Sequence, residues 1–148
     1  MKVCYIGGGG IRILSEVREL LKLEQVRNNK FEIFLYDIAL DRAEVVAALV
    51  RKTPEARKHG KLEVKCSASL DDAVDGADFV IMIARPGGIA NDIYGRYITL
   101  ESGYISTDNL SLNGAFLALD GVPVVMEIAR KMEKLTPDGI MLIFTNPI

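Results

Sequence analysis

The sequence predicts an α/β protein: a Rossmann-like, doubly wound and mostly parallel sheet with helices on both faces. Short apolar runs typical of strands alternate with stretches of helical periodicity, which favours parallel strands joined by right-handed crossovers. The first such run ends in four consecutive glycines, Gly7 to Gly10, and a helical pattern begins directly after them. A strand, a glycine turn and a helix in this order are typical of a dinucleotide-binding βαβ unit. We therefore expect one NAD(P)-binding domain over residues 1–148.

Strands are expected wherever β-branched, aromatic and other apolar residues form a short run between turn signals. These runs cover residues 2–6, 31–36, 62–66, 78–84 and 140–144. The runs at 78–84 and 140–144 are nearly all apolar, as expected of strands that are buried on both faces of a sheet.

Helices are expected where apolar residues recur at spacings of three and four. The pattern predicts helices over 11–27, 41–52, 88–101 and 114–134, and a short helical turn capped by Ser69. In the second helix, Val45, Ala48 and Leu49 are expected on one face, the face towards the core. Pro123 is expected to kink the last helix because proline lacks the amide hydrogen that the helix requires.

The composition is that of an ordinary soluble domain. The net charge of −2 gives no electrostatic reason to expect a nucleic-acid or membrane partner. No uninterrupted apolar run approaches the roughly 18 residues of a membrane span, and the N-terminus leads straight into a strand instead of a signal peptide, which favours the cytoplasm. Cys4 and Cys66 lie in strand-like runs, so we expect buried free thiols and no metal site.

Asp37, at the end of the second predicted strand, is the second part of the predicted cofactor site, beside the glycine turn. Gly7 and Gly9 match the first two positions of the G-x-G-x-x-G fingerprint, but the third position is Arg12. A carboxylate at this strand end accepts hydrogen bonds from ribose hydroxyls and repels a 2′-phosphate, which favours NAD over NADP. The alternatives are a tight structural turn or a mononucleotide site at the glycines, and a turn-initiating role for Asp37.

Arg85, Gly87 and Gly88 follow the strand-like run at 78–84. Ligands of open α/β sheets bind outside the carboxyl ends of the strands. Arg85 is therefore a candidate to bind a carboxylate or phosphate, with the two glycines opening a helix N-terminus towards it. A surface arginine beside a turn is the alternative interpretation.

Four segments in order, IGGGG, LYD, ADFVIMIARPGG and IFTNP, resemble the N-terminal NAD-binding domain of glycosyl hydrolase family 4. These glycosidases are NAD- and metal-dependent and often act on 6-phosphoglycosides, outside the usual two-carboxylate chemistry. The resemblance assigns cofactor binding to Gly7–Gly10, Asp37 and Arg85, and substrate contacts to Arg85 and Asn146. It makes Asp108 the candidate general acid.

The resemblance also implies a reaction. NAD accepts hydride from C3 of the sugar, which acidifies the C2 proton; a tyrosine removes that proton while a divalent metal, manganese, holds the oxidised sugar. The metal ligands and the basic tyrosine of the family lie beyond the T-N-P segment, so no metal ligand is expected in this chain. We therefore expect a cofactor domain cut before the catalytic and metal-binding part, inactive alone, with a sugar or sugar phosphate as its ligand.

The chain departs from the family pattern in the loop that frames the active site. Thr107 stands where the family has glutamine, Asp92 stands where it has arginine, and residues 111–114 replace G-P-G-G. His59, the only histidine, lies in a polar connection and is expected to be solvated.

Two other functions stay open from the sequence. One is the cofactor half of a lactate/malate dehydrogenase-like oxidoreductase, and the other is a non-catalytic dinucleotide-binding module. A missing C-terminal half would leave an apolar patch exposed, which would favour homo-oligomers.

Overall fold

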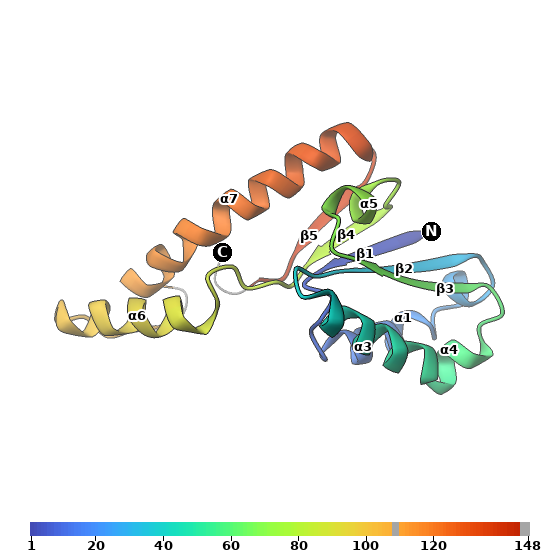
Figure 1. Ribbon diagram of the computed structural model, residues 1–148, viewed down its shortest axis with the longest axis horizontal. Coiled ribbons are helices and arrows are strands. Elements are labelled where there is room, and N and C mark those ends of the chain that lie inside the picture. Colours follow the sequence, from blue (N-terminus) through green and yellow to red (C-terminus); the bar gives the residue numbers. More distant parts are fainter. Residues whose placement is uncertain (108–109, 146–148) are drawn as a thin grey trace. The chain divides into compact units, whose positions relative to one another are not determined.

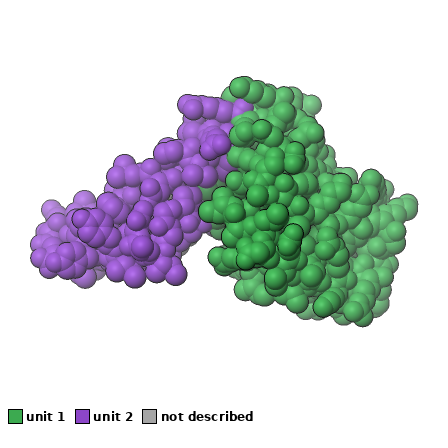
Figure 2. Space-filling view, in the orientation of Figure 1, with its two compact units in different colours: residues 1–84, 131–143 green, residues 85–130, 144–148 purple. Residues whose placement is uncertain are grey.

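The computed structural model describes residues 1–107 and 110–145 (Figure 1). The chain divides into two compact units (Figure 2). Unit 1 comprises Met1–Ala84 and Lys131–Ile143; unit 2 comprises Arg85–Arg130 and the end of the chain from Phe144. Each unit is described by itself.

Unit 1 contains one parallel sheet, which confirms the predicted fold class. Its strands are β1 (Lys2–Ile6), β2 (Phe31–Tyr36), β3 (Leu62–Ser67), β4 (Phe79–Met82) and β5 (Ile140–Ile143). The strand order is β3-β2-β1-β4-β5, and every neighbouring pair is parallel. Val3 of β1 faces Ile33 of β2 on one side and Phe79 of β4 on the other. The chain therefore reverses its direction of winding between β1 and β4, where open α/β sheets bind their ligands.

The helices follow the predicted order with some changes in extent. They are α1 (Ile13–Leu20), α2 (Glu24–Arg27), α3 (Leu40–Lys52), α4 (Pro54–Lys58), α5 (Leu70–Val74), α6 (Gly88–Glu101) and α7 (Leu112–Leu135). Helices α1 and α3 lie on one face of the sheet and α5 on the other, so helices cover both faces (Figure 1). The short turn before α5 has the predicted cap, since the Ser69 hydroxyl accepts a hydrogen bond from the Asp72 amide at 3.3 Å.

The single helix predicted over 11–27 is wrong, because the structure breaks it into α1 and α2. Leu23 between them is extended, with φ −65° and ψ 134°. Leu21 and Val26 are both buried. In one continuous helix they would point about 140° apart, since each residue turns the helix by about 100°. The break therefore lets both side chains reach the core.

The buried face of α3 also differs from the prediction. Val45 is 60% exposed and Leu49 36% exposed, whereas Val46 is only 3% exposed. The buried residues of this helix are Ala43, Val46, Ala47 and Val50. Two alanines in this set let the helix approach the sheet closely, which periodicity alone did not reveal.

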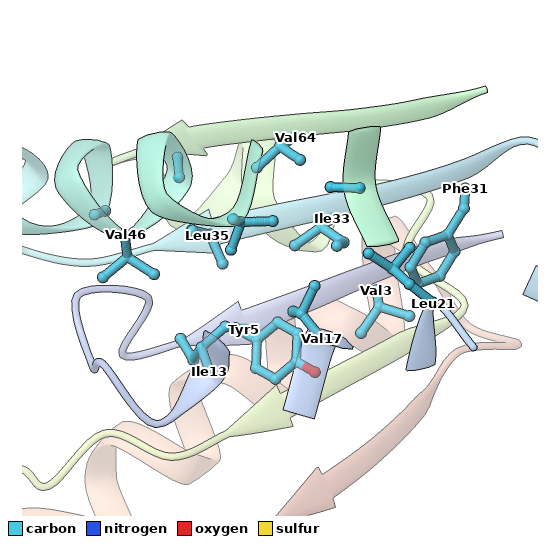
Figure 3. Packing of buried hydrophobic residues seen from close by; sticks show 14 of the residues in the cluster. Val3, Tyr5, Ile13, Val17, Leu21, Phe31, Ile33, Leu35, Val46 and Val64 are labelled. Atoms are coloured by element: carbon cyan, nitrogen blue, oxygen red, sulfur yellow. The ribbon is translucent and has the colours of Figure 1, made fainter. Parts of the chain in front are cut away.

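The core lies on both faces of the sheet because β1 is buried on both faces. Val3 and Tyr5 belong to the cluster that packs against α1 and α3, where Figure 3 shows Tyr5 together with Ile13 and Val17. Cys4, which alternates with them and is fully buried, points to the opposite face. Burial raises the pKa of the Cys4 thiol to about 12, so this cysteine is an inert core residue, as predicted.

His59 is buried, so its predicted solvation is wrong. Its Nε2 lies 2.8 Å from the carbonyl oxygen of Val26, and its Nδ1 accepts a hydrogen bond from the Lys61 amide at 3.3 Å. The ring thus satisfies the carbonyl of α2 and the chain before β3. The contact with Val26 joins residues that are 33 positions apart, so it leaves no local signal in the sequence.

Unit 2 contains α6 and most of α7. On α6, polar and small residues are buried while large apolar residues are exposed. Its buried residues are Asp92, Gly95 and Thr99, whereas Ile93 is 62% and Tyr97 60% exposed. The polar and small residues of this helix therefore face inwards.

In the described part of the chain, α7 alone is long and apolar enough for a membrane span by length and composition, with a mean hydropathy of 1.4 over 18 residues. Core helices of soluble proteins also meet this criterion. The helix carries the acidic residues Asp120 and Glu127 within its length, and the absence of a membrane partner stays a prediction.

We expect Val46→Ala to lower the free energy of unfolding by about 2 kcal/mol, because it leaves a cavity between α3 and the sheet. The neighbouring Val45→Ala is the matched control and should change it by less than about 0.5 kcal/mol. Urea unfolding followed by circular dichroism measures both. Equal losses would mean that α3 buries a different face.

Candidate functional site

The glycine turn is fastened to the end of β2. The amides of Gly7 and Gly8 both donate to the carbonyl oxygen of Tyr36, at 2.9 and 2.7 Å. The next amide, that of Gly9, donates to Oδ2 of Asp37 at 2.8 Å. Three successive N–H groups of the turn therefore bind the last residue of β2 and the carboxylate that follows it.

Three of the four glycines have no room for a side chain. A Cβ on Gly7 would lie 2.8 Å from the amide nitrogen of Ala84, and Gly7 also has a φ of +98°. A Cβ on Gly8 would lie 2.7 Å from Cβ of Leu35, and one on Gly9 would lie 2.8 Å from Oδ2 of Asp37. A Cβ on the fourth glycine would meet its nearest atom at 3.4 Å. Packing against β2 and the end of β4 thus accounts for the first three glycines.

Asp37 is held on both of its carboxylate oxygens. Oδ2 accepts from the Gly9 amide, and Oδ1 accepts from the Ala39 amide at 2.9 Å. Each oxygen keeps a further lone pair, since a carboxylate oxygen accepts two hydrogen bonds. The side chain of Arg42 also lies against the turn, because a Cβ on Gly9 would lie 2.8 Å from Cβ of Arg42. The carboxylate is therefore oriented beside the turn and can still accept hydrogen bonds from a ligand.

The end of β4 is joined to the end of β1 in a similar way. The amides of Ile83 and Ala84 both donate to the carbonyl oxygen of Ile6, at 2.9 and 3.0 Å. The chain then enters unit 2 at Arg85 and turns into α6 through Gly87 and Gly88, with φ of +79° and +65°. Two successive left-handed residues explain why both are glycine.

In unit 2, the Arg85 side chain lies in a cluster centred on Asp92. Oδ2 of Asp92 is 3.2 Å from Nη2 of Arg85. Oδ1 accepts hydrogen bonds from Nε of Arg96 at 3.1 Å and from Nδ2 of Asn113 at 3.0 Å. The hydrogen bond from Asn113 and the two guanidinium groups hold the pKa of the Asp92 carboxyl below its usual value, against the opposing effect of burial.

The structure brings Gly7–Gly10 and Asp37 together, as the sequence predicts for a cofactor site. Arg85 belongs to unit 2, and its guanidinium pairs with Asp92. Asp108 and Asn146 lie outside the described residues, so their roles stay predictions.

Sequence reasoning did not anticipate the Asp92 cluster. The signal that could have revealed the pair with Arg96 is the spacing of four residues on one predicted helix. The contact with Asn113 joins α6 to α7 and left no local signal.

The chain supplies no cation site in residues 1–107 and 110–145: no three His, Cys, Asp or Glu side chains gather there. Both cysteines are free thiols, as predicted, but Cys66 is only half-buried, so the prediction that it is buried is wrong.

The sheet order, the glycine turn after β1 and the carboxylate after β2 define a protein of the Rossmann-fold class. The model of the family 4 glycosyl hydrolases matches residues 2–148. The chain belongs to glycosyl hydrolase family 4.

Named relatives agree with this assignment. The chain is 30% identical to the 6-phospho-beta-glucosidase BglT of Thermotoga maritima over 99% of its own length and 34% of the relative's. It is 28% identical to an alpha-galacturonidase of Thermoanaerobacter italicus over its whole length and 32% of that protein. The chain thus spans about a third of the length of these curated relatives.

Solved structures show the same fold. The 6-phospho-beta glucosidase of Thermotoga maritima, with manganese, NAD+ and glucose-6-phosphate, has a TM-score of 0.86 at 27% identity, covering 99% of this chain and 35% of that one. A malate dehydrogenase of Naegleria fowleri has a TM-score of 0.64 at 17% identity, covering 99% of this chain and 39% of that one. The second likeness concerns the fold alone.

We expect Gly8→Ala to lower the free energy of unfolding by about 1–3 kcal/mol, because the added methyl meets β2. Gly10→Ala is the control within the same turn and should stay within about 0.5 kcal/mol of the wild type. Urea unfolding compares the two. A neutral Gly8→Ala would contradict the close packing of this turn.

Stability should also depend on the protonation of Asp92. Its pKa is lowered in the folded chain, so its contribution is complete above the ordinary value of about 3.9 and is lost as the pH falls through the lower folded value. The difference in unfolding free energy between wild type and Asp92→Asn should therefore be largest near about pH 7 and shrink towards about pH 3. Urea unfolding at several pH values measures it, and a difference that does not change with pH would contradict this role.

Proposed function

We propose that this chain is the NAD-binding part of an NAD- and divalent-metal-dependent glycosidase. The observation that carries the proposal is the Asp37 carboxylate, held by the Gly9 amide at the carboxyl edge of the sheet. Family membership supports it, as does the relative from Thermotoga maritima whose structure contains manganese, NAD+ and glucose-6-phosphate.

The turn suits a dinucleotide in its backbone and in its charges. In the described part of the chain, the amides of Ile11 and Arg12 donate no hydrogen bond to another protein group, and α1 begins directly after them. Such amides at a helix start bind phosphate oxygens. Asp37 then accepts hydrogen bonds from the ribose hydroxyls and disfavours a 2′-phosphate.

NAD supplies a hydride acceptor when it is bound. In the proposed reaction, the residues of this chain bind and orient. Arg85 follows the strand end that lies beside the glycine turn and contacts the cofactor or the sugar. Asn146 contacts the sugar, and Asp108 donates a proton to the leaving group as general acid.

The described residues do not provide a metal site, so the proposed metal, manganese, is held by residues outside them. We infer that the chain by itself binds cofactor and ligand but does not turn over. A sugar or sugar phosphate is the proposed ligand, and the cytoplasm the proposed location.

A non-catalytic dinucleotide-binding module is the second candidate. The same observation favours it, because the glycine turn and Asp37 are both present, while residues 1–107 and 110–145 hold no complete catalytic set. The two candidates differ in whether a C-terminal catalytic part accompanies the chain in the working protein.

A calorimetric titration of the whole chain should show binding of NAD and much weaker binding of NADP. Asp37→Asn should weaken NAD by about tenfold, because the charged acceptor of the ribose hydroxyls is lost, and should reduce the preference over NADP. Asp41→Asn, an exposed neighbour on α3, is the matched control. Absence of NAD binding by the folded chain, or tighter binding of NADP by the wild type, would contradict the proposed cofactor.

A further inference from the structure

Asp92 on α6 carries a carboxylate that is nearly buried beside two arginines. Its two oxygens contact the guanidinium groups of Arg85 and Arg96 and the amide of Asn113, at 3.0 to 3.2 Å. The Asp92 side chain is only 12% exposed, whereas that of Arg85 is 38% exposed. The carboxylate thus lies beneath a half-exposed guanidinium.

The carboxylate cannot turn away from Arg85 without losing other contacts. Its Oδ1 is fixed by Asn113, which is fully buried, and by Arg96 one helical turn later. Gly95 leaves the space for Asn113, because a Cβ at position 95 would clash with its side-chain oxygen. Helix packing therefore keeps a negative charge beside Arg85.

This charge changes what Arg85 can bind. A guanidinium that already pairs with a carboxylate attracts an incoming anion less strongly. A phosphate dianion placed against Arg85 would also approach Asp92, and like charges repel. The hydroxyl groups of an uncharged sugar are not repelled by Asp92, and they can still accept hydrogen bonds from Arg85.

We propose that Asp92 is a positioning residue that sets ligand specificity: it holds Arg85 for a glycoside without a phosphate group and disfavours a phosphorylated one. This inference rests on the proposed function, in which Arg85 contacts the sugar. The ligand class is therefore an uncharged sugar, in contrast to the glucose-6-phosphate present with the relative from Thermotoga maritima.

The test titrates the whole chain with glucose 6-phosphate and with glucose, by NMR or calorimetry at low ionic strength. The wild type should bind glucose 6-phosphate no more tightly than glucose. Asp92→Asn keeps the shape and removes the charge, so it should bind glucose 6-phosphate about fivefold more tightly than the wild type does, the upper end for a half-exposed ion pair. Its affinity for glucose should change by less than about twofold, because the amide oxygen at position 92 still accepts a hydrogen bond from Arg85 and keeps it in place.

Two variants separate pairing with Arg85 from general charge and from folding. Asp120→Asn removes another carboxylate that joins α7 to α6, through Asn91 at 2.6 Å, and should leave the ratio of the two affinities unchanged. Asp92→Glu should retain the low affinity for glucose 6-phosphate.

The proposal is overturned by a wild type that prefers glucose 6-phosphate, which would instead make Arg85 and Arg96 a phosphate site. It is equally overturned if Asp92→Asn gains no affinity for glucose 6-phosphate. The wild-type comparison stands even if the variant fails to fold. Titration of the same samples with NAD reports separately on the proposed function, since the glycine turn and Asp37 belong to unit 1.

Discussion

The position of the glycine turn in unit 1 depends on two backbone amides that donate to the same carbonyl oxygen. The Gly7 and Gly8 N–H groups both reach the carbonyl oxygen of Tyr36, which brings the turn directly onto the end of β2. At this distance the turn has no room for side chains, and a Cβ on Gly8 would collide with Leu35. The same approach places the Gly9 amide on the carboxylate of Asp37. Glycine is therefore required here by the contact between turn and strand, and the oriented carboxylate is a consequence of that contact.

The features that could be predicted from the sequence are those with a local or strongly periodic signal. The strands were identified from runs of apolar residues, and Gly7–Gly10 with Asp37 from their positions at two strand ends. These signals work because the core must cover both faces of the central strands of a parallel sheet. The apolar run of β5 was also predicted to be buried, and this is wrong: β5 is an edge strand, Ile140 is 51% exposed and the rest of the strand is only half-buried. The fold class and the composition of the glycine turn site follow from such constraints, whereas the strand order was read from the structure.

Three of the features that were missed depend on contacts distant in sequence. His59 is buried because the carbonyl of Val26, 33 residues earlier, needs a partner. The predicted helix over 11–27 breaks because Leu21 and Val26 must both reach the core. The Asp92 cluster depends on Asn113, a residue on another helix. Periodicity reports which residues prefer burial, but it does not report which polar group each buried polar residue will meet.

Two carboxylates, Asp37 and Asp92, show how differently the two units use the same chemical group. Backbone amides hold Asp37, so its charge is oriented yet remains available to accept hydrogen bonds from a ligand. Asp92 is held by cationic and amide side chains, so much of its charge is matched within the protein. A carboxylate of the first kind selects a ligand by direct contact. One of the second kind acts through its neighbour, because it changes the charge that Arg85 presents. Unit 1 has the sheet order and glycine turn of the Rossmann class, and under the proposed role of Asp92 one carboxylate on α6 alters what the adjoining arginine recognises.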